Sequence, residues 1–293
     1  MITGFPKRPG LAARLLTVLA TTLSVGALAD PSATAAVMCA TPSVAMYHVD
    51  ALSQLRRWSY ASPIDGSSGW TEQSIGSGWG ALNVVSGGSG VLYAVDSSGN
   101  LRWYLDDDYS GGAASWDPAS GSVIGTGWGG FSTVVSGGQG VIYAVDAHGN
   151  LRWYRYLGSG SPMWATGSGN VIGSGWAGLS RIVAGGSGVI YAVDSSGALL
   201  WYRHQDPLGG SASWAGGGAS SRIGSGWSGF TAIGSMGGGV LFARDSTGRM
   251  DWYRDTDPLG GSASWSNGGG GTAEGTGWNN NQVITDVAGC TAS

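Results

Sequence analysis

The sequence predicts an all-β protein, a five-bladed β-propeller built from repeats of about 50 residues. Three observations support this fold. The tetrapeptide Gly-x-Gly-Trp occurs five times, at spacings of 48 to 51 residues. β-Rich runs joined by short Gly-containing turns lie between the copies. These runs are apolar on both faces, which is typical of sheets packed between other sheets. A parallel β-solenoid is the alternative, but its coils are shorter and lack tight hairpins.

One repeat shows the expected elements in order. Residues 91–96 and 101–105 are β-rich and are separated by a polar turn, so they read as a hairpin. A looser Gly/Ser-rich stretch follows, in which we expect a short fourth strand near residues 116–124. After the next Gly-x-Gly-Trp, residues 131–136 form a third clear strand. Residues 137–140 then turn into the following hairpin.

The short turn sets where each blade begins. Crossing from the outermost to the innermost strand spans about 14 Å, which a turn of this length barely reaches. The turn therefore lies within a blade, and the crossing between blades uses the stretch around Gly-x-Gly-Trp. The chain enters at residues 44–50, which match a second strand, and leaves at residues 283–287, which match a first strand. We expect the last strand to complete the first blade.

Cys39 and Cys290 are the only cysteines, and each lies where a Gly-rich turn stands in the other repeats. In an exported protein such a pair is expected to form a disulfide, which here would lock the ring. A lipid-modified Cys39 is the alternative. It is disfavoured because Met38 occupies a position that this processing reserves for a small residue.

Residues 1–36 lie outside the repeats and resemble a secretory signal peptide, which leaves residues 37–293 as the propeller. A basic start precedes an apolar run diluted by small residues, which makes a membrane anchor the less favoured reading. Removing Lys7, Arg8, Arg14 and Asp30 changes the net charge from −4 to −4 − 3 + 1 = −6. We expect a secreted, extracellular monomer that binds no nucleic acid and does not insert into membranes.

The fifteen tryptophans fall into three sets of five. The set that ends Gly-x-Gly-Trp is Trp79, Trp128, Trp176, Trp227 and Trp278. The set in the second hairpin strand is Trp58, Trp103, Trp153, Trp201 and Trp252. The set in the long Gly/Ser-rich loops is Trp70, Trp116, Trp164, Trp214 and Trp265.

The sequence around each tryptophan set predicts a different role for it. Flanking glycines allow the first set to pack between blades. We therefore expect these tryptophans to be structural, and they are our second choice for residues that contact a ligand. The strand set alternates with polar residues and belongs to the core. The loop set has no packing obligation, and an exposed indole suits the C–H face and hydroxyls of a sugar. We therefore expect the loop tryptophans to bind carbohydrate.

The phrase Ile-Gly-Ser-Gly-Trp-x-Gly-Phe, followed by Gly-x-Gly-Val-Ile-Tyr-Ala-Val-Asp, is similar to the tachylectin repeat. The resemblance covers residues 44–287. It implies a five-bladed propeller lectin that binds N-acetylated amino sugars such as GlcNAc or GalNAc, with up to five equivalent sites.

Catalysis finds little support in the sequence. Asp50, Asp96, Asp146, Asp194 and Asp245 each precede a hairpin turn, which is typical of Asx-turn chemistry. The three histidines occupy three different repeat positions, and no catalytic set or metal-ligand spacing recurs. We expect no enzyme, metal or cofactor. A propeller enzyme or protein-binding scaffold with one axial or facial site remains the alternative.

Overall fold

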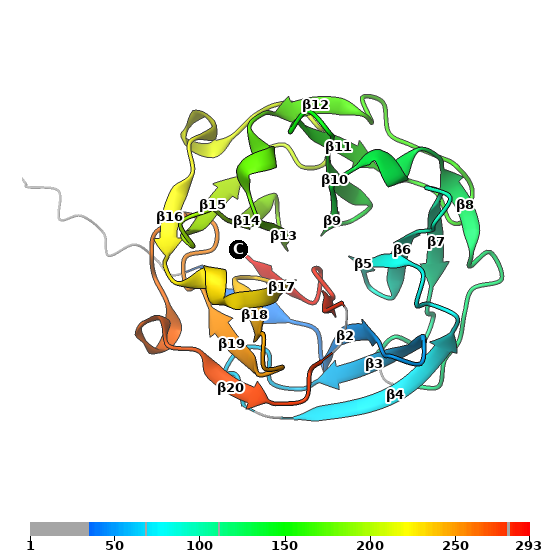
Figure 1. The fold of residues 1–293 in the computed structure, drawn as a ribbon, viewed down its shortest axis with the longest axis horizontal. Coiled ribbons are helices and arrows are strands. Elements are labelled where there is room, and N and C mark those ends of the chain that lie inside the picture. Colours follow the sequence, from blue (N-terminus) through cyan, green and yellow to red (C-terminus); the bar gives the residue numbers. More distant parts are fainter. Residues whose placement is uncertain (1–34, 68, 111, 280–281) are drawn as a thin grey trace, which may run out of the picture. The chain divides into compact units, whose positions relative to one another are not determined.

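Five β-sheets stand in a ring in the computed structural model, and within each blade successive strands lie farther from the central axis (Figure 1). The structure describes residues 35–67, 69–110, 112–279 and 282–293. The predicted signal segment, residues 1–36, lies almost wholly outside the described part of the chain. The predicted five-bladed β-propeller is confirmed.

The blades follow one another along the chain, and each is named here by its order. Blade 1 is β21 (Ile284–Thr285), β2 (Val44–Val49), β3 (Gln54–Tyr60) and β4 (Trp70–Ser77). Blade 2 is β5 (Asn83–Gly88), β6 (Val91–Val95), β7 (Leu101–Leu105) and β8 (Ser122–Gly125). Blade 3 is β9 (Thr133–Gly138), β10 (Val141–Val145), β11 (Leu151–Arg155) and β12 (Asn170–Gly173).

The last two blades repeat this order. Blade 4 is β13 (Arg181–Gly186), β14 (Val189–Val193), β15 (Leu199–Arg203) and β16 (Ser221–Gly224). Blade 5 is β17 (Phe230–Gly237), β18 (Val240–Asp245), β19 (Met250–Arg254) and β20 (Thr272–Gly275). Short 3-10 turns begin at three Gly-x-Gly-Trp tryptophans, η1 (Trp128–Gly130), η2 (Trp176–Gly178) and η4 (Trp227–Gly229), and two more lie in loops, η3 (Ala215–Gly218) and η5 (Ser266–Gly269).

The hydrophobic core lies between the sheets. Side chains of β10 such as Tyr143 form one cluster with Ile190 of β14 in the next blade, and Trp153 and Trp176 belong to the same cluster. Similar clusters occupy the other blade junctions. Because each sheet is covered on both sides, its inner strands are apolar on both faces.

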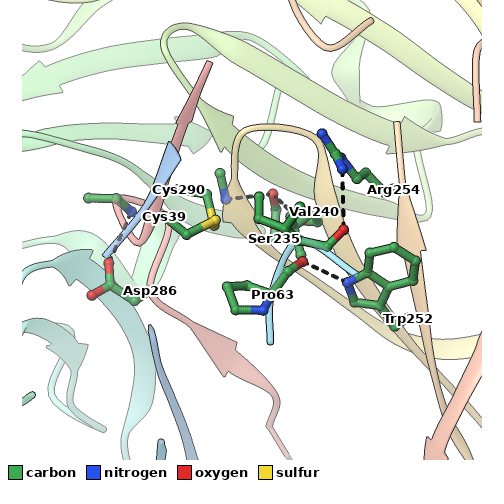
Figure 2. The surroundings of a disulfide bond; sticks show 11 residues. Cys39, Pro63, Ser235, Val240, Trp252, Arg254, Asp286 and Cys290 are labelled. Atoms are coloured by element: carbon green, nitrogen blue, oxygen red, sulfur yellow. Dashed lines mark hydrogen bonds between the residues drawn. A yellow bond between two sulfur atoms is a disulfide. The ribbon is translucent and has the colours of Figure 1, made fainter. Parts of the chain in front are cut away.

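The ring closes as predicted. β21 from the end of the chain pairs with β2 near its start, and Thr285 lies opposite Met46. β1 (Val37–Cys39) and β22 (Cys290–Ala292) form an antiparallel pair that extends the sheet of blade 5, because Cys290 pairs with Gly237 of β17, and in this pair Cys39 faces Cys290. The two cysteines form a disulfide with their Cα atoms 3.9 Å apart (Figure 2). The predicted disulfide is confirmed, and the lipid-modified Cys39 is not what the structure shows.

Blade 1 departs from the predicted repeat by one position. In blade 2, Tyr93 lies opposite Trp103 across the hairpin. In blade 1 the equivalent Tyr47 lies opposite Arg57, and Trp58 follows one residue later, where the other blades have tyrosine. Grouping Trp58 with Trp103 is therefore wrong: the strand set has four members, and an arginine takes the fifth place.

Among the described residues, none lies in a helix with the length and apolar character to cross a membrane.

Candidate functional site

A cavity of about 420 Å³ lies at the rim of the ring between blades 3 and 4. Blade 3 contributes the outer strand and the Gly-x-Gly-Trp crossing, through Ile172 and residues 173–176. Blade 4 contributes Tyr202 of β15 and the loop tryptophan Trp214. The remaining lining residues are Leu179, Gly217, Gly218 and Ser220.

Three aromatic rings line this rim cavity. The rings of Trp176 and Tyr202 lie 4.8 Å apart, and those of Trp176 and Trp214 lie 6.0 Å apart with 38° between their planes. Trp176 is 5% exposed and Trp214 is half-buried. The cavity therefore draws on both the first-choice and the second-choice tryptophan sets of the sequence analysis.

Trp214 does not hang free in its loop. Its indole N–H donates to the backbone carbonyl of Ile172 in blade 3 at 2.6 Å. The indole thus bridges two blades, and its N–H is already used. A ligand would meet the ring face and edge of Trp214 rather than its N–H group, which differs from the exposed indole that the sequence predicts.

The same bridge recurs at three other junctions. It is made by Trp116 to Ile75 at 2.9 Å, by Trp164 to Ile124 at 3.0 Å and by Trp265 to Ile223 at 2.7 Å. In each case the loop tryptophan lies near a Gly-x-Gly-Trp tryptophan, with ring centres 5.6 Å apart for Trp79, 5.8 Å for Trp128 and 5.9 Å for Trp227. Four junctions therefore share one arrangement.

The lining of the rim cavity carries no charged side chain. Its polar groups are the hydroxyls of Ser174, Ser220 and Tyr202 and the backbone amides and carbonyls of glycines. Gly175 has a φ of 82°, in the left-handed region, and this conformation places Trp176 at the start of η2. Aromatic faces combined with a few fixed polar groups suit a neutral ligand that has both an apolar face and hydroxyl or amide groups.

Three of the four strand tryptophans, Trp153, Trp201 and Trp252, clamp their blade to the next one. Trp153 donates its indole N–H to the carbonyl of Pro207 in the next blade at 2.8 Å, and Arg155 donates to the carbonyl of Leu208 at 3.0 Å. The same clamp joins Trp201 to Pro258, Arg203 to Leu259, Trp252 to Pro63 and Arg254 to Ile64, and Figure 2 shows the bond between Trp252 and Pro63. The repeated loops at residues 206–214 and 257–265 thus serve as docking points between blades.

Arg57 replaces this clamp in blade 1. It is 1% exposed and donates to the carboxylate of Asp106 and to the backbone carbonyl of Asp108, each at 2.6 Å. A third bond goes to Gln73 at 2.9 Å. A fully buried ion pair of this kind holds blades 1 and 2 together, and sequence reasoning missed it.

The recurring aspartates are structural, as predicted. Asp96 accepts from the backbone N–H groups of Ser98 and Asn100, each at 3.0 Å, and its other oxygen accepts from Arg102 Nε at 2.8 Å. The backbone bond from Asn100, followed by the other donors, lowers the pKa of Asp96 to about 2. These carboxylates hold the hairpin turns.

Two histidines are buried in packing positions. Burial lowers the pKa of His48 to about 4, and its Nδ1 accepts the indole N–H of Trp58 at 2.8 Å. His204 lies 3.0 Å from the hydroxyl of Tyr143 in the neighbouring blade. Among the described residues no group of His, Cys, Asp and Glu has the arrangement of a metal site.

The ring axis holds a second, smaller cavity of about 100 Å³. It is lined by the innermost strands of all five blades, mostly with Val, Ile and Ala side chains. Ligand pockets usually span about 300–1,000 Å³. The axial cavity is below this range, whereas the rim cavity is within it, so the geometry favours the rim over the axial site of the alternative reading.

Comparison with known proteins gives a family and a fold. The model of the tachylectin family matches residues 37–284. A solved chain from work on the de novo evolutionary emergence of a symmetrical protein is 19% identical, with a TM-score of 0.52 over 82% of this chain and 98% of that chain. This likeness supports the propeller fold.

Two lectin structures are more distant. A variant of the Aleuria aurantia lectin in complex with α-methyl-L-fucoside is 17% identical over 86% of this chain and 82% of that chain, with a TM-score of 0.44. The lectin BP39L from Burkholderia pseudomallei is 18% identical over 82% of this chain and 70% of that chain, with a TM-score of 0.40. No curated protein matches the sequence.

Proposed function

The chain belongs to the tachylectin family, and from this premise we propose that it is a lectin whose sugar sites are the rim cavities between blades. The observation that carries the proposal is the uncharged aromatic cavity between blades 3 and 4. Each site combines a loop tryptophan of one blade with the Gly-x-Gly-Trp tryptophan and glycine-rich backbone that lead into that blade. Stacking of a sugar C–H face on these rings and bonds from its polar groups to the backbone would hold the ligand.

We propose neutral N-acetylated amino sugars, such as GlcNAc or GalNAc, as the ligands. The tachylectin resemblance implies them, and the chemistry of the rim cavity supports them. An acetamido group offers a methyl for the indole faces and an amide for the glycine backbone and for Ser174 or Ser220. The uncharged lining offers no partner for the charge of a uronic acid or a free amino sugar.

Several copies of the site on one chain raise the apparent binding affinity for a glycan-covered surface. A shallow site of this kind is expected to bind a single sugar with a Kd of about 1 μM to 1 mM. Several sites on one rigid ring can bind one glycan-covered surface, and such avidity adds roughly 10²–10⁴ to the apparent affinity. We further propose that residues 1–36 direct export, and that residues 37–293 act outside the cell as a monomer.

Glycan-array binding followed by titration calorimetry tests this function. We expect binding to glycans that end in N-acetylated amino sugars, with several sugars bound per chain and no binding to glucuronic acid or glucosamine. Replacing Trp116, Trp164, Trp214 and Trp265 together by Phe should lower the affinity at least tenfold while the β-sheet circular-dichroism signal persists. The matched control Trp153→Phe, in a buried blade clamp, should leave affinity unchanged. A folded wild type that binds no sugar would contradict the proposal.

A further inference from the structure

The junction between blade 5 and blade 1 differs from the other four in its outer strand. β20 carries Glu274 where β8, β12 and β16 carry isoleucine. The Glu274 carboxylate is 8% exposed and accepts the indole N–H of Trp70 and the hydroxyl of Tyr60, each at 2.9 Å. A side-chain carboxylate here replaces the backbone carbonyl that receives the loop tryptophan elsewhere.

Aromatic rings fill the space in front of this carboxylate. Trp58 stands where Tyr202 lines the rim cavity of blade 4, and its larger ring lies 5.0 Å from that of Trp278. Tyr60 stacks on Trp70 with ring centres 4.0 Å apart and 16° between the planes. The ring of Trp70 also packs edge-on against Trp278 at 5.6 Å. Tyr60 thus covers one face of the Trp70 ring, whereas at the blade 3–4 junction the residue in that place, His204, lies 5.2 Å from Trp214 with 34° between the planes.

The outer wall of the cavity is also missing at this junction. In blade 4, Gly217, Gly218 and Ser220 follow the loop tryptophan and form that wall. In blade 1, Trp70 is itself the first residue of β4, which runs without interruption to Ser77 and pairs with β3 along its length. The residues after Trp70 are therefore held in the sheet and cannot curve out as a wall.

We infer that the blade 5–blade 1 junction is a sealed structural joint that takes no sugar, which leaves at most four sugar sites in a five-bladed ring. This inference rests on the proposed function. The sealed joint also has a mechanical role. The inner strand of blade 1 is the two-residue β21, with one further bond from the N–H of Asp286 to the carbonyl of Ala45 in β2. The bonds from Tyr60 and Trp70 to Glu274 add a second attachment, which fastens β3 and β4 to blade 5.

Native mass spectrometry with saturating GlcNAc counts the bound sugars, and calorimetry with the same sugar checks the count. We expect four per wild-type chain. The matched variants Trp214→Phe and Trp70→Phe alter the same repeat position, at an open junction and at the sealed joint. Trp214→Phe should reduce the count by one. Trp70→Phe should leave the count unchanged and lower the melting temperature, because Glu274 loses a buried donor.

The outcomes separate the two proposals. One to four sugars on the wild type, with no loss in Trp70→Phe, supports the inference. Five sugars on the wild type overturn it, as does a loss of one sugar in Trp70→Phe. If Trp70→Phe does not fold, the wild-type count decides the question alone. No sugar bound to folded wild-type protein contradicts the proposed function instead.

Discussion

Asp255 is a buried carboxylate in blade 5 that accepts the hydroxyl of Tyr191 in blade 4 at 3.0 Å. Burial raises its pKa to about 6, against the lowering effect of the backbone N–H of Asp257 and the Tyr191 hydroxyl. Between about pH 4 and pH 6 the folded chain holds this proton more tightly than the unfolded chain does. The contribution of Asp255 to the free energy of unfolding therefore falls as pH rises through this window.

Asp255→Asn should remove this pH dependence. Relative to wild type, the variant should gain about 1–3 kcal/mol in the free energy of unfolding as pH rises from 4 to 7. Urea denaturation of both proteins at several pH values measures the difference. Taking the difference matters because His48 and His204, whose pKa values are lowered by burial, change the stability in the opposite direction. A constant difference across the range would show that the pKa of Asp255 is not raised in the folded protein.

Arg57 shows why one residue of the repeat escaped prediction. The neighbouring Trp58 completes a count of fifteen, so the tryptophans alone suggest five intact repeats. The correct register was available from Leu55-Arg56, which matches Leu101-Arg102 two positions before the strand tryptophan. The partner of Arg57, Asp106, lies 49 residues away in another blade, and nothing in local sequence signals that pairing.

Glycines in the loops between strands serve two separate needs, which one pair of variants distinguishes. Gly210 has a φ of 76°, and a Cβ there would overlap the ring of Trp153. Gly216 has a φ of 59° with no atom within 4 Å of such a Cβ. Gly216→Ala should cost about 1–2 kcal/mol, from left-handed backbone alone. Gly210→Ala should cost about 1–3 kcal/mol more because the clamp must also shift.

Thermal or urea unfolding of the two glycine variants measures this difference. Equal losses in the free energy of unfolding would mean that Trp153 and its bond to Pro207 can shift without lowering the stability. The Trp153 clamp would then contribute little to blade packing.

The predictability of the elements follows from how local their signals are. The hairpins of β6 and β7 were predicted almost to the residue, because an apolar run, an Asx turn and a second run lie within fifteen residues of sequence. The outer strand β8 has four residues, one of which is glycine, so its place was predicted only approximately. The loops at residues 206–214 carry no periodicity, and their docking role depends on a clamp that belongs to the preceding blade.

At the scale of the whole ring, the disulfide is the covalent link between the two ends of the propeller. Cys39 and Cys290 are separated by 251 residues. In the chain-entropy model a loop of this length contributes roughly 5.5 kcal/mol, and loss of a native disulfide commonly costs about 2–5 kcal/mol. Cys39→Ser with Cys290→Ser should lower the melting temperature by about 5–15 °C.

Calorimetry with and without reductant checks the expected loss. Wild type in reductant should behave like the double variant, and the double variant should not respond to reductant. An unchanged melting temperature in the variant would show that strand pairing alone holds the ring closed.

The fold of the whole molecule was predictable, whereas the site was predictable only in part. A period of about 50 residues and the turn chemistry suffice for five blades and for their closure. The rim cavity, however, is built from two repeats. The indole N–H of Trp214 bonds to the carbonyl of Ile172, which lies 42 residues away in the sequence, and this bond sets the orientation of the indole. The aromatic residues of the site were therefore predictable from the sequence, but the hydrogen bond between blades that orients the loop tryptophan was not.

The closing pair of β1 and β22 also makes the polypeptide nearly circular. Ser293 donates its backbone N–H to the carbonyl of Ala36 at 3.0 Å, so the two ends of the described propeller touch. A peptide bond that joined these two ends would not change how the sheets are arranged. If the chain were then cut at an exposed Asx turn, every sheet would keep the same neighbours. The chain could therefore start in any blade without changing the order of the blades around the ring. The propeller is compatible with circular permutation.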